Sequence, residues 1–165
     1  MFHPVPLEPE DLRHLTAAHG YVELGMLHEA NEELEHIDAD VRHVPEVLAT
    51  RVLIYHGLEK WELLQVVAKK LADCDPEEPQ WAISLAYATR RADSIPAAKS
   101  ILLEAVARHP NEAMFHFNLA CYACQLGDLD AAKEFLARAI SLDKRLRGTA
   151  LNDEDLEPLW QSLTP

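Results

Sequence analysis

The sequence predicts an all-α protein in which four helical hairpins of equal length follow one another. Gly is scarce, with 5 in 165 residues, and the helix-favouring residues Ala and Leu are abundant. Apolar residues recur at helical spacing of three or four along most of the chain. Small residues also return at a constant interval of 34 residues, as in the column Ala120, Ala86, Val52 and Ala18.

Composition and charge narrow the classes of partner and of cellular location. A chain of 165 residues with 48% apolar content suits one domain with a buried core. The 28 acidic and 15 basic residues give a net charge of −13, which disfavours nucleic acids and anionic membranes as partners. The sequence contains no secretory signal pattern, no membrane-length apolar run and an odd number of cysteines. We therefore expect a cytoplasmic protein without nucleic-acid or membrane partners.

The 34-residue interval places further residues in columns that have a physical meaning. Small or apolar residues recur inside the second helix of each hairpin, where they let two helices approach closely. A turn column holds two glycines, which accept a left-handed backbone, and a closing column holds two prolines, which end the preceding helix. The second-helix column is Ala132, Ala98, Leu64, Ala30; the turn column is Gly127, Asp93, Glu59, Gly25; the closing column is Lys144, Pro110, Pro76, Arg42.

Apolar spacing, turn residues and caps together predict eight helices and a terminal cap. Asp128 and Asp153 are expected to be N-caps, and Pro96 falls where a first-turn proline is tolerated. The segment 153–163 leaves the repeat and places Leu and Trp residues on one side, which predicts a capping helix over the last hairpin. The eight helices are expected at 9–24, 27–39, 45–57, 60–73, 78–91, 95–108, 112–126 and 129–142.

This pattern resembles the tetratricopeptide repeat (TPR) family, whose unit is a helix–turn–helix of 34 residues. The resemblance covers about residues 11–146 and is strongest in the third and fourth units. It is weakest in the second unit, where Arg51 replaces a large apolar residue and Glu59 replaces the turn glycine. The resemblance implies a right-handed α-solenoid in one domain, 1–165. Its four units would be 11–44, 45–78, 79–112 and 113–146, followed by the capping helix at about 153–163.

The resemblance also implies where function resides. In this family the first helices of the units line a concave groove that holds a peptide, as an extended segment or as a helix. Arg90 or Arg91 would pair with an acidic group of the ligand, beside apolar anchors. We therefore expect a non-catalytic scaffold or adaptor that binds a peptide or protein segment. The expected groove residues are Leu53, Ile83, Tyr87, Arg90, Arg91, Met114, Phe117 and Cys121.

The Cys-x-x-Cys pair Cys121 and Cys124 does not predict redox or metal chemistry. Reactive pairs of this kind lie at a helix N-terminus, where the dipole lowers the thiol pKa, whereas both cysteines here fall in mid-helix. The nine histidines contain no i, i+4 pair and no His-Glu-x-x-His motif. We therefore expect no catalytic residues, no metal and no cofactor.

Two alternatives to peptide binding remain open at the level of sequence. The apolar groove residues could pack on one another, or the apolar face and the C-terminal helix could mediate self-association, which allows a monomer or a weak homodimer. The secretion-chaperone members of the family are similar in size and acidity, so a role of that type is a fold-level analogy.

Overall fold

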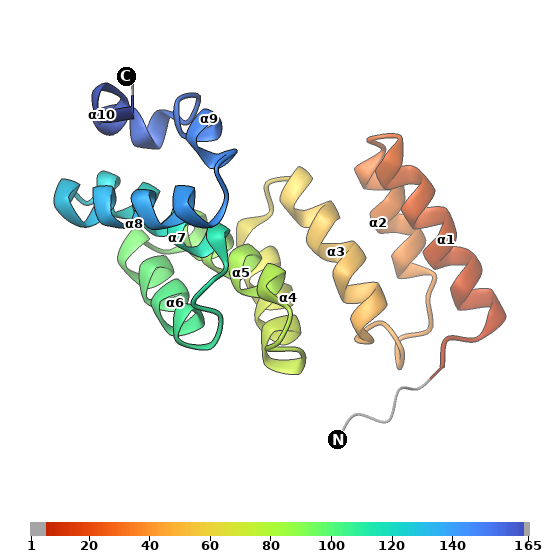
Figure 1. Cartoon of the computed structure of the whole chain (residues 1–165). Helices are drawn as coiled ribbons and strands as arrows, with labels where there is room; N and C mark the ends of the chain where they lie inside the picture. The colour runs from red at the N-terminus through yellow and green to blue at the C-terminus, as the bar shows by residue number, and fades with distance from the viewer. Residues whose placement is uncertain (1–5, 164–165) are drawn as a thin grey trace. The chain divides into compact units, whose positions relative to one another are not determined.

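The computed structural model describes residues 6–163, and its only regular secondary structure in that range is helical (Figure 1). The chain divides into two compact units, one ending at Pro76 and the other beginning at Glu77. The first unit contains α1 (Pro9–Glu23), α2 (Leu27–Glu35), α3 (Pro45–Gly57) and α4 (Trp61–Cys74). The second contains α5 (Pro79–Ala92), α6 (Ile95–Arg108), α7 (Ala113–Gln125), α8 (Leu129–Leu142), α9 (Leu146–Ala150), the 3₁₀ helix η1 (Glu154–Leu159) and α10 (Trp160–Leu163).

The predicted all-α fold of paired helices is confirmed. Within each unit, helices that follow one another in sequence pack together: α1 with α2 and α3 with α4, then α5 with α6 and α7 with α8. All eight predicted helices are present, and their ends differ from the prediction by at most one residue except at the end of α2. The prediction of a single domain over 1–165 stays a prediction. None of the helices within 6–163 is long and apolar enough to cross a membrane.

Helix α2 ends at Glu35, four residues before the predicted end at residue 39. The side chain of Arg42 donates to the carbonyl oxygens of Ile37, at 2.7 Å, and Glu35. The buried carboxylate of Asp11 accepts the backbone N–H of Asp38 at 2.9 Å. These side chains bind backbone groups that a longer helix would use itself, so the chain turns here toward α3.

The repeated small residues form the helix contacts that the sequence predicted. In the first unit Ala18, Ala30 and Ala68 have no exposed surface, and in the second unit the same is true of Ala86, Ala98, Ala120 and Ala132. Side chains of this size let helix backbones approach closely at their crossings. The core of the second unit adds Leu102, Phe115, Leu119, Leu136, Leu156 and Leu159.

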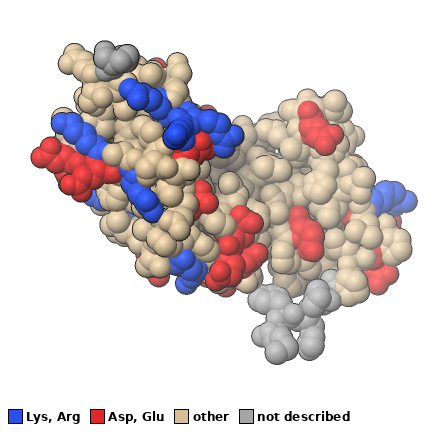
Figure 2. Space-filling view, in the orientation of Figure 1, with Lys and Arg blue, Asp and Glu red and all other residues tan. Residues whose placement is uncertain are grey.

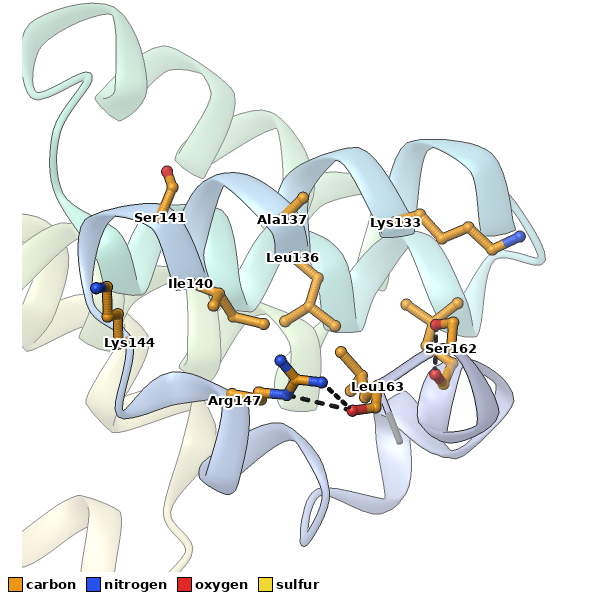
Figure 3. A pocket seen from close by; sticks show the side chains of 10 residues that line it. Lys133, Leu136, Ala137, Ile140, Ser141, Lys144, Arg147, Ser162 and Leu163 are labelled. Carbon is orange, nitrogen blue, oxygen red and sulfur yellow. Dashed lines mark hydrogen bonds between the residues drawn. The ribbon is translucent and has the colours of Figure 1, made fainter. Parts of the chain in front are cut away.

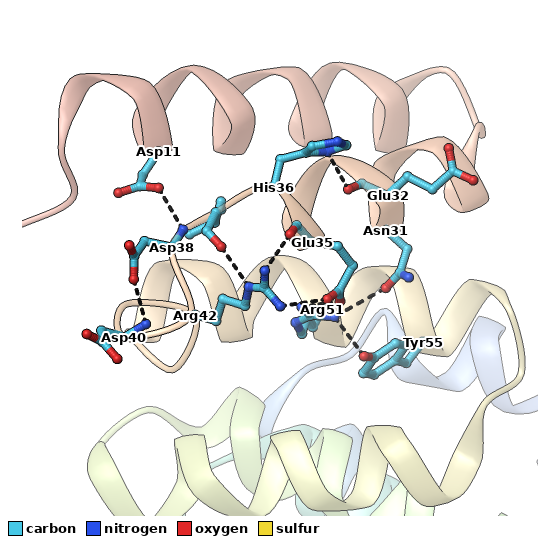
Figure 4. A network of polar contacts seen from close by, with 11 residues as sticks. Asp11, Asn31, Glu32, Glu35, His36, Asp38, Asp40, Arg42, Arg51 and Tyr55 are labelled. Atoms are coloured by element: carbon cyan, nitrogen blue, oxygen red, sulfur yellow. Dashed lines mark hydrogen bonds and ion pairs between the residues drawn. The ribbon is translucent and has the colours of Figure 1, made fainter.

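Arg51, the residue that departs most from the repeat, lies in a polar network inside the first unit (Figure 4). Its guanidinium donates to the carboxylate of Glu35 at 2.7 Å and to the hydroxyl of Tyr55 at 2.8 Å, and Arg42 donates to the other oxygen of Glu35 at 2.9 Å. Asn31 accepts a further hydrogen bond from Arg51 at 3.3 Å. In the second helical hairpin, a buried cation whose hydrogen bonds are satisfied therefore takes the place of an apolar contact.

The turn column shows which positions need a left-handed backbone. Gly25 and Gly127 have φ values of 74° and 79°, as expected for glycine. Glu59 adopts the same region, with φ 55°, although it carries a side chain, which strains the backbone. Asp93 has φ −128°, so the third turn closes in a different way.

The C-terminal segment differs from the predicted capping helix. Residues 146–150 form the unexpected short helix α9, and the predicted helix at 153–163 is divided into η1 and α10, with Pro158 inside η1. Asp153 is the N-cap of η1, as predicted, because its carboxylate accepts the N–H of Asp155 at 3.0 Å. Leu156 and Leu159 are buried, so the segment covers the last hairpin as a cap should.

Candidate protein-binding surface

The eight predicted groove residues lie on the first helix of their hairpins, in both units. Leu53 belongs to α3 of the first unit, and its side chain is 56% exposed. The other seven belong to α5 and α7 of the second unit. Ile83 and Met114 are partly buried and pack against the core cluster. The seven residues on α5 and α7 therefore belong to one compact unit.

Three of the predicted residues line a groove on α5. Tyr87, Arg90 and Arg91 form one wall, and the segment that links α9 to η1 forms the other. The cavity has a volume of about 510 Å³. Arg91 is exposed, whereas Tyr87 and Arg90 are partly buried. The residues of the opposite wall are Thr149, Asn152, Asp153, Glu154 and Asp155.

Arg90 forms a bidentate ion pair with Asp155 across this groove. Its Nη2 donates to Oδ1 of Asp155 at 2.9 Å, and its Nη1 donates to Oδ2. The guanidinium also lies 5.6 Å from the ring centroid of Tyr122, within cation–π distance. The hydrogen bonds that Arg90 donates to Asp155 raise the pKa of Arg90 despite its burial, so the side chain stays charged. Two planar groups in this arrangement give a strong, directional contact.

Two of the three predicted groove residues of α7 are buried. Phe117 and Cys121 are each 3% exposed, so neither side chain is accessible to a partner. The thiol of Cys121 lies 3.8 Å from a carboxylate oxygen of Asp153, and the amide of Gln125 lies 3.5 Å from the carbonyl oxygen of Asp155. Sequence reasoning placed these α7 residues on an open face because the segment lies outside the repeat. The feature of the sequence that indicates where this segment packs is its charge, with four acids and no base in residues 149–165.

Burial determines the chemistry of the Cys-x-x-Cys pair. Burial and the neighbouring carboxylates of Asp153 and Asp155 raise the pKa of Cys121, and the same causes raise the pKa of Cys124. Burial therefore favours the neutral thiol form of both side chains, which is a weak nucleophile.

Two clusters bring ligand-type atoms within 4.8 Å of one another in residues 6–163. In the first, from α1 and the end of α2, the rings of His14 and His36 are stacked with an interplanar angle of 17°, and Oε2 of Glu33 accepts from Nδ1 of His14 at 2.8 Å. Lone pairs lie in the ring planes, so nearly parallel rings do not direct them at one ion. In the second cluster, Asp155 is already bound by Arg90.

Comparison with known proteins identifies the fold. No family model matches the chain, and no curated protein matches its sequence. Among solved structures, the chain is similar to MamA (MSR-1), at 25% identity with a TM-score of 0.70 over 81% of this chain and 76% of that one.

Two further structures extend the similarity. A Podosopora anserina putative kinesin light chain with nearly identical TPR-like repeats matches at 18% identity and a TM-score of 0.63, over 94% of this chain and 88% of that one. PcrH, solved with the chaperone binding region of PopB, matches at 21% identity and a TM-score of 0.54, over 77% and 94%. Together with the helical hairpins and their small-residue contacts, these similarities show that the chain has the fold of the tetratricopeptide repeat family.

Proposed function

We propose that the protein is a non-catalytic interaction scaffold that binds an acidic peptide segment of another protein beside α5. The observation that carries the proposal is the groove wall of Tyr87, Arg90 and Arg91. An aromatic ring and two cations on one helix face suit an extended segment that has apolar and carboxylate side chains. The partly buried Ile83 and Met114 add apolar surface to this part of the unit.

The contact that Arg90 already makes supports the chemistry of the ligand. Arg90 binds Asp155 of its own chain through both guanidinium nitrogens, so this position of α5 is built to hold a carboxylate. Arg91 is exposed next to it on the same groove wall. PcrH, which shares the fold, was solved in complex with a region of PopB, and a scaffold of this fold is thus compatible with holding a segment of another protein.

Affinity capture from cell extract with three forms of the protein tests the proposal. We expect Tyr87→Glu/Arg91→Glu to lose a partner that the wild type captures, because the change removes the aromatic ring and one of the two cations from the α5 wall and puts two carboxylates in their place. The control is Arg108→Glu, an exposed charge reversal at the end of α6. Circular dichroism checks that all three forms are equally helical. Equal capture of the same partner by all three would refute the groove assignment.

A further inference from the structure

A second groove lies on the other side of the C-terminal segment, between α8 and α10 (Figure 3). Leu136 and Ile140 of α8 form part of its floor, and Leu159 and Leu163 of the C-terminal segment form the rest. Its volume is about 780 Å³. This groove shares no lining residue with the groove beside α5.

The repeat explains why this groove is open. Leu136 stands 34 residues after Leu102, the equivalent position on α6. Helix α6 packs against α7, an unbroken helix of 13 residues. Helix α8 is instead followed by helices of 5, 6 and 4 residues. Three short pieces cover less of a helix face than one long helix does: Leu136 is buried like Leu102, but Ala137 is exposed and Ile140 is only partly buried.

The rim of the groove is basic although the protein is strongly acidic. Lys133, Lys144 and Arg147 line it, and no acidic residue is among its described lining residues. Neither lysine forms an ion pair with a residue in the described range. Arg147 donates from Nε to the backbone carbonyl of Leu163 at 3.2 Å, and no carboxylate of residues 6–163 pairs with it. Figure 2 shows Lys and Arg side chains gathered over the part of the second unit that carries α8 and α9.

We propose that this groove is a second binding site, which takes an acidic amphipathic helix from a partner protein. We infer that the occupant is a helix from a comparison with the preceding hairpin. There a helix, α7, lies against α6, the equivalent of α8. Its buried side must be apolar, to match the floor of leucine and isoleucine side chains. Its flanks must carry Glu or Asp, because three cations that pair with no carboxylate of the described residues, with low-dielectric surface between them, favour carboxylates.

Binding of a labelled model peptide tests this site. The probe is a helical peptide of about 14 residues, long enough to form a stable helix on a surface, with Leu at i, i+3, i+4 and i+7 and Glu elsewhere. Its matched partner has Lys in place of Glu. Fluorescence anisotropy should show binding of the Glu peptide that weakens as salt is added, and little binding of the Lys peptide.

Variants that reverse the charge of the groove rim test where the peptide binds. Lys133→Glu/Lys144→Glu should weaken binding of the Glu peptide about tenfold, since each reversal removes an attraction and adds a repulsion. The control Lys99→Glu/Arg108→Glu makes the same charge change on α6, and Lys99 is the repeat equivalent of Lys133. The Tyr87→Glu/Arg91→Glu variant should bind the peptide as the wild type does, which separates this site from the groove beside α5.

Three outcomes would overturn the proposal. The first is equal binding of the Glu and Lys peptides, and the second is equal binding by the Lys133/Lys144 variant and its α6 control. The third is a concentration-dependent dimer in light scattering that the Lys133/Lys144 variant loses, since this would assign the groove to a second copy of the chain. Circular dichroism of each variant confirms that a loss of binding is not a loss of fold.

Discussion

Arg90 and Asp155 are 65 residues apart in the sequence, yet they form a bidentate ion pair. The arginine comes from α5, within the repeats, and the aspartate comes from the C-terminal segment beyond them. This contact attaches the segment to the helix that also carries Tyr87 and Arg91. One interaction therefore links the stability of the cap with the shape of the candidate groove.

Asp155→Asn should lower the free energy of unfolding by about 1–2 kcal/mol, the usual worth of hydrogen bonds to a charged group. The amide keeps the size of the side chain but removes its charge and one acceptor. Urea denaturation followed by circular dichroism measures the change. The control is Lys69→Gln, which breaks the exposed pair with Asp73 and should cost less than about 0.5 kcal/mol. Equal losses in the two variants would show that the Arg90 contact is no stronger than a surface pair.

Arg51→Ala should destabilise the protein by about 2 kcal/mol, because it removes the packing of a buried side chain and the cation that binds Glu35 and Tyr55. Arg51→Met restores an apolar residue of similar length at a repeat position that is usually apolar. It should therefore cost clearly less than alanine, because both variants lose the contacts with Glu35 and Tyr55 but methionine keeps most of the packing of the buried side chain. Denaturation curves of the two variants decide this, and an equal or larger loss for Met would contradict it.

Stability should fall at acidic pH in part through Glu35. The hydrogen bond from Arg51 lowers the pKa of Glu35 in the folded protein below its ordinary value of 4.5, and the charges of Arg51 and Arg42 act in the same direction. The folded state therefore binds fewer protons than the unfolded state in this range. The stabilisation is complete above about pH 4.5, the unfolded value, and is lost as the pH falls through the lower folded pKa.

Glu35→Gln isolates this contribution from those of the other acids. Urea denaturation of both forms across the acidic range should give a difference in stability that is largest near neutral pH and shrinks as the pH falls. A difference that stays constant with pH would mean that the charge of Glu35 adds no stability.

Glu59→Gly should raise the free energy of unfolding by about 1 kcal/mol, because glycine adopts a positive φ without the steric cost that a side chain carries. The same substitution at the equivalent turn residue, Asp93→Gly, is the control. Asp93 has φ −128°, so glycine brings no relief there and its extra backbone freedom should destabilise by about 0.5–1 kcal/mol. Thermal and urea denaturation measure both. Opposite signs are expected, and the same sign for both variants would count against strain at Glu59.

The three cysteines should react with a thiol reagent at different rates. Cys74 is exposed, whereas Cys121 and Cys124 are buried with raised pKa values. A disulfide reagent added at neutral pH should therefore modify one thiol quickly and the other two only as the second unit opens. Cys74→Ser should abolish the fast phase. A fast phase that persists in this variant would mean that the pair on α7 is accessible.

Local and periodic information in the sequence predicted most of the fold. Helix ends were correct to about one residue where a proline, a glycine or a capping carboxylate marks them, as at Asp128, whose carboxylate accepts the N–H of Ala131 at 3.1 Å. The predicted end of α2 was wrong because two side chains from outside the helix, Arg42 and Asp11, bind the backbone at the point where it stops. Contacts of that kind have no signature at the position where the helix ends.

The sequence by itself determined the helical hairpins, their length and the column of small residues at their crossings, because these depend on spacing within one or two turns of helix. It also marked Tyr87, Arg90 and Arg91 as neighbours on one helix face. Only the tertiary structure decided that Phe117 and Cys121 are covered and that Arg90 holds Asp155. It alone revealed the basic groove on α8, because the C-terminal segment lies outside the repeat. Where such a segment packs depends on which apolar and charged surfaces the folded repeats leave uncovered.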